Sequence, residues 1–98
     1  FERVEHAIFR LGKDGSVIET NSKFKEMFGE VAGLCDILIG EKTAPDCLRK
    51  ALAEKGLHLE DMAIGKKGDE IIISLSLYPE TDSSGNITGF DGFLINIT

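Results

Sequence analysis

The chain has 98 residues, of which 42% are hydrophobic and 29% are charged, and its formal net charge is −6. This length suits a single domain with one hydrophobic core, and the composition is that of a globular protein, not of a disordered segment. Because the acidic excess repels phosphate groups, we expect no direct contact with nucleic acid or with a membrane surface.

The small number of cysteines and the shortness of the apolar runs bear on where in the cell the protein is found. Cys35 and Cys47 are too few and too far apart for a zinc or haem-attachment motif, and no disulfide is needed. No apolar run approaches the ~20 residues that cross a bilayer, and no signal peptide opens the chain. We therefore expect a cytoplasmic protein. Since the chain starts with Phe1 and not with Met, we expect one domain over residues 1–98, cut from a larger protein.

The first elements predicted are two strands joined by a tight turn. Residues 7–11 and 16–20 suit strands, and Lys13-Asp14-Gly15-Ser16 between them is a typical hairpin turn. If Glu19 points to solvent, the alternation of a strand places Ile18 in the interior.

A short helix should follow this hairpin. Asn21 or Ser22 can cap it, and the spacing of Phe24, Met27 and Phe28 gives it one apolar face that ends at Gly29. From residue 30 to residue 42 the signals are weak, and a buried turn of helix with a loop is expected.

A second, longer helix is predicted over residues 44–55. Thr43 suits its N-cap, and Gly56 is a stop signal. Leu48 and Leu52 lie four residues apart, so we expect both to pack against the inward face of a sheet.

Three strands complete the chain. They are predicted over residues 57–64, in an uncertain register, over residues 71–78, ended by Pro79, and over residues 87–97. A meander of this kind cannot bury its sheet alone, so the helices should cover one face of it. The fold class is therefore α+β.

The motifs of the chain, in this order and spacing, resemble the PAS family over essentially the whole length. Those that resemble the family are the Lys13-Asp14-Gly15 turn, Asn21 before a helix ending at Phe28-Gly29, Tyr78-Pro79, Asp82 to Gly85, Gly89 to Phe93, and Asn96-Ile97-Thr98. The family often ends in Asp-Ile-Thr. Asn96 in place of that Asp keeps hydrogen bonding but loses the charge, so we expect no salt bridge from this position at the end of the last strand.

The resemblance implies a five-stranded antiparallel sheet in the order 2-1-5-4-3 with helices on one face. It also implies a sensory domain, often part of a two-component system. Such a domain relays a signal to a histidine kinase, a cyclic-dinucleotide enzyme or a transcription regulator, and many hold haem, a flavin, a carboxylic acid or nothing between helices and sheet. A ligand-free dimerisation and relay module is the alternative.

A candidate ligand cavity follows from the alternation and from the resemblance. Its inward-facing residues either form a plain packed core or surround a small apolar ligand. They are Phe9, Leu11, Ile18, Phe24, Phe28, Leu38, Leu48, Leu52, Ile73, Leu75, Leu77, Phe90 and Leu94.

Flavin and haem are both disfavoured. Flavin-binding photosensors of the family use the motif Asn-Cys-Arg-Phe-Leu-Gln-Gly and a Gln on the last strand. Around Cys35 the flanking Asn and Gln are missing, Leu94 stands at the last-strand position, and the chain has no Gln at all. Haem-binding members place an axial His on the long helix, whereas His6 and His58 lie outside residues 44–55.

No catalytic or metal-binding motif is found, and we expect no enzyme. Glu60 and Asp61 are adjacent and so point to opposite faces of a strand, and Glu80 and Asp82 are assigned to a turn.

The outward face of the sheet is predicted to be an interaction surface. Ile72, Tyr78, Phe93 and Ile95 would form an exposed apolar patch there, which monomers seldom tolerate at large size. The resemblance agrees, because PAS domains commonly pair through this face. We expect a homodimer, with help from a flanking helix that residues 1–4 end and from the output domain of the parent chain.

Overall fold

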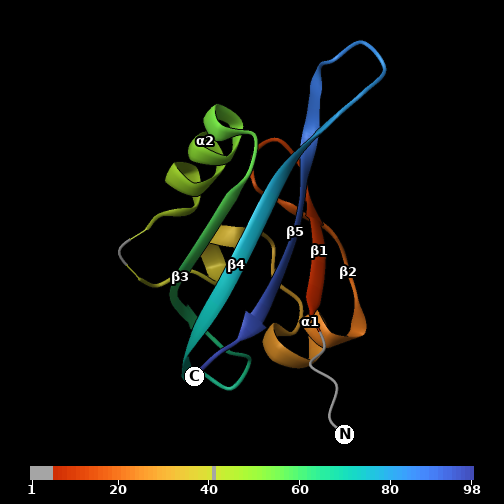
Figure 1. Ribbon diagram of the computed structural model, residues 1–98. Coiled ribbons are helices and arrows are strands. Elements are labelled where there is room, and N and C mark those ends of the chain that lie inside the picture. The colour runs from red at the N-terminus through yellow and green to blue at the C-terminus, as the bar shows by residue number, and fades with distance from the viewer. Residues whose placement is uncertain (1–5, 41) are drawn as a thin grey trace, which may run out of the picture.

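The computed structural model describes residues 6–40 and 42–98. Its elements form a five-stranded antiparallel sheet in the order β2-β1-β5-β4-β3, as predicted (Figure 1). In chain order they are β1 (Ala7–Leu11), β2 (Val17–Thr20), α1 (Ser22–Phe28), the 3-10 helix η1 (Leu34–Asp36), α2 (Ala44–Glu54), β3 (Leu57–Ile64), β4 (Glu70–Thr81) and β5 (Ile87–Asn96).

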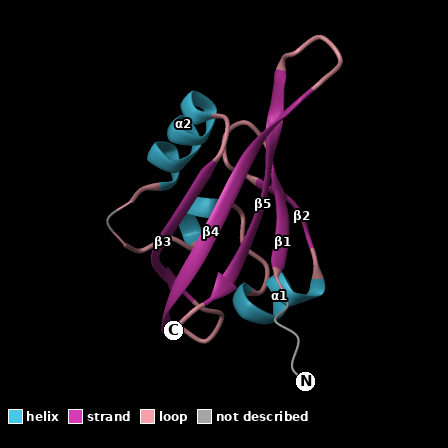
Figure 2. Cartoon of the chain, viewed as in Figure 1, coloured by secondary structure: helices cyan, strands magenta, loops and turns pink. Residues whose placement is uncertain are grey.

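The core lies between the helical segments and one face of the sheet (Figure 2). β1, β4 and β5 are the central strands, and each turns alternate side chains inward, so their inner residues are among the most buried in the chain. Residues 1–4, which were predicted to end a flanking helix, lie outside the residues that the structure describes.

The prediction that Ile18 faces the interior is wrong, because β2 contains a bulge. Arg10 pairs with Glu19 and Leu11 pairs with Val17, so Ile18 is an extra residue opposite no partner. A bulge interrupts the alternation of a strand. Glu19 therefore points to solvent as expected, but the side chain of Ile18 is 57% exposed.

Asn21 fixes both the start of α1 and the start of β1. Its Oδ1 accepts hydrogen bonds from the amides of Phe24 and Ile8, both at 3.0 Å, and its Nδ2 donates to the carbonyl of His6. One side chain thus caps the helix and ties it to the first strand. Gly29 ends α1 with a φ of 73°, a left-handed backbone that glycine adopts without strain.

α2 begins as predicted but buries a narrower face than expected. Thr43 Oγ1 accepts from the amide of Asp46, 3.2 Å away. The buried residues of the helix are Ala44, Cys47, Leu48 and Ala51. Leu52 lies at the edge of this stripe, 43% exposed, so its predicted place in the core is wrong.

β4 runs past Pro79, where its end was predicted. The carbonyl of Ile72 accepts from the amide of Ile97, so even-numbered residues of β4 turn their backbone groups towards β5 and odd-numbered residues towards β3. β3 starts at Leu57, opposite Leu77, so within the described strands no residue faces Pro79 on that side. Proline therefore costs the sheet no hydrogen bond there.

The register of β3 is regular, although the sequence left it open. Every residue of β3 pairs with one of β4 in turn, from Leu57 with Leu77 to Ile64 with Glu70. The apparent slip in the pattern arises because Asp61 takes an inward position near the edge of the sheet. There its Oδ2 accepts a hydrogen bond from the amide of Lys42.

Candidate functional site

The strand faces directed away from the helices form one continuous surface, which we call the outer face. Its residues are His6, Ile8 and Arg10 at β1, Glu19 of β2, His58, Glu60 and Met62 of β3, Glu70, Ile72, Ser74, Ser76, Tyr78 and Glu80 of β4, and Asp91, Phe93 and Ile95 of β5. Three of the four residues predicted for an interaction surface point outward next to one another: Tyr78, Phe93 and Ile95.

An aromatic cluster occupies the centre of the outer face. Phe93 stacks on Tyr78 with ring centroids 6.3 Å apart and ring planes inclined by 27°, and it meets His6 edge to face at 5.1 Å. Ile8, the cross-strand partner of Phe93, is 54% exposed. Beside these side chains lies a hollow of about 350 Å³. The cluster therefore presents apolar surface and a concavity to solvent.

The fourth predicted residue extends this apolar surface along β4. Ile72 is 43% exposed, and it pairs across the strands with Met62, which is also exposed. Between Ile72 and the aromatic cluster lie two hydroxyls, of Ser74 and Ser76. His58 Nδ1 lies 2.9 Å from Ser76 Oγ, so the imidazole is held against the sheet.

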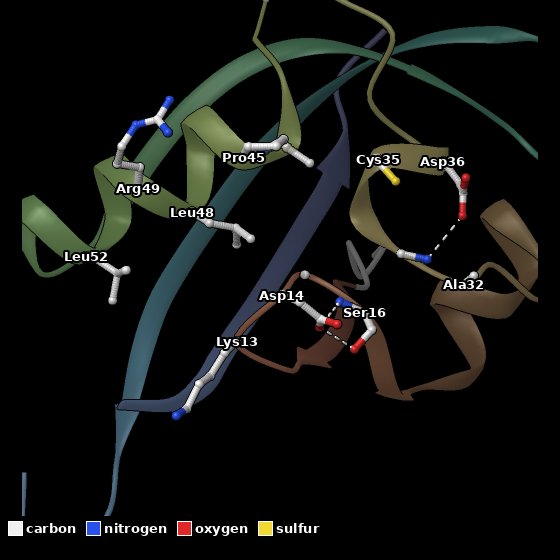
Figure 3. A pocket seen from close by; sticks show the side chains of 13 residues that line it. Lys13, Asp14, Ser16, Ala32, Cys35, Asp36, Pro45, Leu48, Arg49 and Leu52 are labelled. Atoms are coloured by element: carbon white, nitrogen blue, oxygen red, sulfur yellow. Dashed lines mark hydrogen bonds between the residues drawn. The ribbon is translucent and has the colours of Figure 1, made fainter. Parts of the chain in front are cut away.

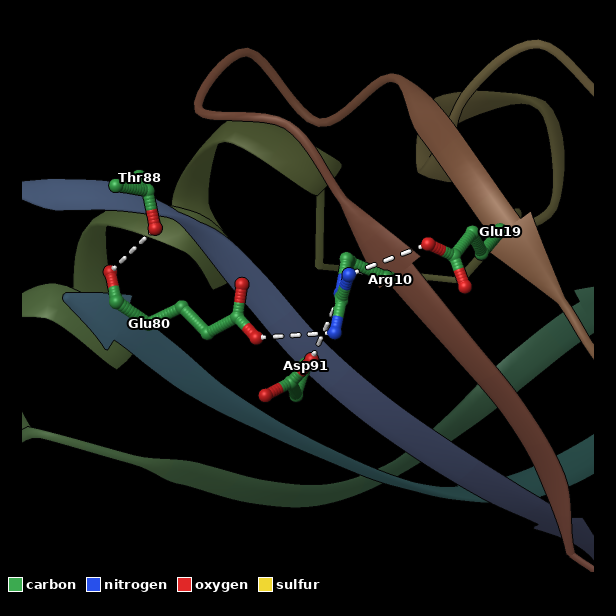
Figure 4. Close-up of polar contacts among 5 residues, drawn as sticks. All are labelled: Arg10, Glu19, Glu80, Thr88 and Asp91. Carbon is green, nitrogen blue, oxygen red and sulfur yellow. Dashed lines mark hydrogen bonds and ion pairs between the residues drawn. The ribbon is translucent and has the colours of Figure 1, made fainter. Parts of the chain in front are cut away.

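A charged group borders the aromatic cluster, with Arg10 at its centre (Figure 4). The guanidinium lies 3.2 Å from Glu19 and 3.5 Å from both Glu80 and Asp91. The three carboxylates, Glu80 most, raise the pKa of Arg10. A hydrogen bond with Asp91, then burial and the negative charge of Asp91, raise the pKa of Glu80. Glu80 is a strand residue and not, as predicted, part of a turn.

A second hollow, of about 610 Å³, lies between α2, η1 and the turn that joins β1 to β2 (Figure 3). Leu48, Leu52 and Pro45 line it from α2, and Cys35 and Asp36 from η1. Of the thirteen residues predicted for a ligand cavity, only Leu48 and Leu52 border this hollow. It therefore differs in position from the predicted cavity.

Eleven of the thirteen predicted cavity residues lie in the core. All thirteen except Ile18 and Leu52 are buried and belong to one cluster. Phe9, Phe24 and Phe28 pack ring against ring within it, at centroid distances of 5.4 and 5.1 Å. Whether a ligand enters among them stays a prediction.

The residues considered for cofactors lie apart from one another. Cys35 is exposed and Cys47 is buried, and burial raises the pKa of the Cys47 thiol. His6 and His58 lie on the outer face, away from α2. Within residues 6–40 and 42–98, no three His, Cys, Asp or Glu side chains are grouped as metal ligands. In the same ranges no helix is long and apolar enough to cross a membrane.

Sequence reasoning missed the Arg10 cluster and the triple role of Asn21. The cluster joins residues from four strands. Because β1 lies between β2 and β5 in the sheet, Arg10 is opposite both Glu19 and Asp91. The alternation of charge on the outward positions was a usable signal once that order was assumed.

A family model described as PAS domain matches residues 5–98. No curated protein matches the sequence.

Solved structures share the fold at low sequence identity. The PAS domain of a protein from Colwellia psychrerythraea is 15% identical with a TM-score of 0.79, over 95% of this chain and 86% of that chain. The light-state dimer of the fungal blue-light photoreceptor Vivid is 16% identical with a TM-score of 0.75, over 98% and 82%. An RNA-binding light-oxygen-voltage receptor is 15% identical with a TM-score of 0.75, over 94% of this chain but 30% of that one.

Proposed function

The chain belongs to the PAS domain family, a family of sensory signalling modules, and we propose that it relays a signal to an attached output domain by pairing through its outer face. The domain performs no catalysis of its own. Its partner is a second copy of the same chain, and a change in the geometry of the pair is what the output domain detects. Candidate output domains are a histidine kinase, a cyclic-dinucleotide enzyme and a transcription regulator.

The observation that supports this proposal most is the apolar surface of the outer face. Ile8 and Tyr78, 54% and 46% exposed, adjoin the half-buried Phe93. Ile72, 43% exposed, lies further along β4, beyond Ser74 and Ser76. Apolar side chains gathered on one face mark a site of association more often than a free surface. The photoreceptor Vivid, which shares this fold, forms a light-state dimer, and this is consistent with pairing by a domain of this fold.

Replacing Phe93 by Glu tests the proposal. A carboxylate at the centre of the aromatic cluster would be desolvated between two copies, so Phe93→Glu should shift the sedimentation equilibrium from dimer to monomer. Leu52→Glu is the matched control, because Leu52 is exposed on α2 and not on the outer face. Circular dichroism should show both variants folded.

The proposal is contradicted if the unmodified chain stays monomeric at high concentration, or if both variants dissociate equally.

Ligand sensing is the second candidate function. The hollow of about 610 Å³ beside α2 favours it, since this is within the size range of small-molecule sites. Its floor is largely aliphatic, with Ala44, Leu48 and Leu52, so an apolar molecule suits it better than a charged one. A molecule there would contact both α2 and the turn before β2, and so could alter their spacing.

A further inference from the structure

The two histidines of the chain lie on the same face of the sheet. The ring of His6 is 5.1 Å from that of Phe93, and His58 bonds to Ser76, the cross-strand partner of Phe93. Both imidazoles are exposed. Since the chain has only two His residues, both of its imidazoles lie on this face. Imidazole is the side chain whose charge changes most readily between about pH 5 and pH 8.

The outer face is otherwise strongly acidic. Near pH 8, among the described residues, one cation stands against five carboxylates, which gives this face a net charge of −4. The cation is Arg10, and the carboxylates are Glu19, Glu60, Glu70, Glu80 and Asp91. When two identical faces meet, each brings the same charge, so their repulsion grows with the square of it.

We propose that mild acid strengthens the pairing of two copies, because protonation of His6 and His58 halves the negative charge of each outer face. The inference rests on the proposed function, since it concerns the same surface. A change from −4 to −2 on each face lowers the product of the two charges from 16 to 4. Like-charge repulsion between the faces thus falls about fourfold.

One carboxylate of this face acts in the same direction. The pKa of Glu80 is raised, chiefly by its hydrogen bond with Asp91, so Glu80 loses its charge at a higher pH than an ordinary glutamate. In the single chain both imidazoles are exposed, so the cost of charging them there is low.

Sedimentation equilibrium of the unmodified chain at about pH 8 and about pH 6 tests the inference. The dissociation constant of the dimer should fall about tenfold on acidification, an ordinary size for coupling between proton binding and association. In the double variant His6→Gln/His58→Gln, which keeps polarity without the charge, the change should stay below about twofold. High salt at about pH 8 should also tighten the unmodified dimer, because it screens the same repulsion.

The other possible outcomes contradict the inference, the role of the histidines or the proposed function, as follows. Equal or weaker pairing at about pH 6 overturns the inference and leaves the proposed function standing. A pH response that survives in the double variant overturns the role of the histidines. A monomer at every pH and salt concentration overturns the proposed function, and the inference with it.

Discussion

Asn21 shows how much one polar side chain organises at the residue scale. A helix start leaves amides without partners, and a strand start leaves a free amide and carbonyl. Asn21 bonds to an amide of each element and to the carbonyl of His6, so three backbone groups depend on it. A serine at this position could cap the helix, but it has no amide group with which to hold the strand.

Asn21→Ala should lower the free energy of unfolding by about 1–3 kcal/mol, because a lost cap costs about 1 kcal/mol and two further bonds are lost with it. Ser22→Ala, at an exposed neighbour, should change it by less than about 0.5 kcal/mol. Urea titration of both variants measures the difference. Equal losses would mean that the three bonds of Asn21 do not stabilise the fold.

At the scale of one element, α2 shows why helical spacing alone does not define a buried face. Leu48 and Leu52 have the same spacing pattern, and both were expected in the core. The helix lies over the sheet on its small side chains Ala44, Cys47 and Ala51, with Leu48 beside them. Because these small side chains let α2 approach the sheet closely, only a narrow stripe of the helix is buried. Leu52 lies outside this buried stripe.

Leu48→Ala should therefore destabilise the chain by about 2–4 kcal/mol, through lost burial and the space left behind. Leu52→Ala, one turn further along the same helix, should cost less than about 1 kcal/mol. Urea titration checks this pair, with the slope of unfolding as a guide to any change in the unfolded state. A larger loss for Leu52 would contradict the placement of α2.

At the scale of the whole molecule, the two faces of the sheet differ in what covers them. The inner face packs against the helices, with the side chains of Ile73, Leu75 and Leu77 fully buried. The outer face leaves apolar and titratable side chains in contact with solvent. Signals that alter pairing would act on the outer face, whereas a small molecule would act through the hollow beside α2.

The purified protein should be colourless, because the polar partners of a flavin and the axial His of a haem are missing from the expected positions. Absorption spectra of fresh protein measure this directly, and a stoichiometric flavin or haem band would contradict it. Native mass spectrometry of the same sample distinguishes the two candidate functions. A retained small apolar molecule supports ligand sensing, and its loss in a Leu48→Trp variant would locate it in the hollow beside α2.

Local sequence signals were enough to predict the helices, the strands and most of the core. The order of the strands in the sheet came from the resemblance to the PAS family. Capping side chains, turn residues and alternating apolar positions act over a few residues, so Thr43 and Ile73 were placed correctly from the sequence alone, and Asn21 was one of two caps considered for the first helix. The outward direction of Tyr78 followed from the same alternation.

Three features depended on contacts between distant segments, which local periodicity does not contain. The bulge at Ile18 arises from the pairing of β1 with β2, and the tolerance of Pro79 arises because β3 starts opposite Leu77. The meeting of His6, His58 and Phe93 on one face required the order of all five strands. Alternation in the sequence determined which residues of a regular strand lie on the same side of it. Only the tertiary structure decided which side chains from different strands lie next to one another, because that depends on strand order and register.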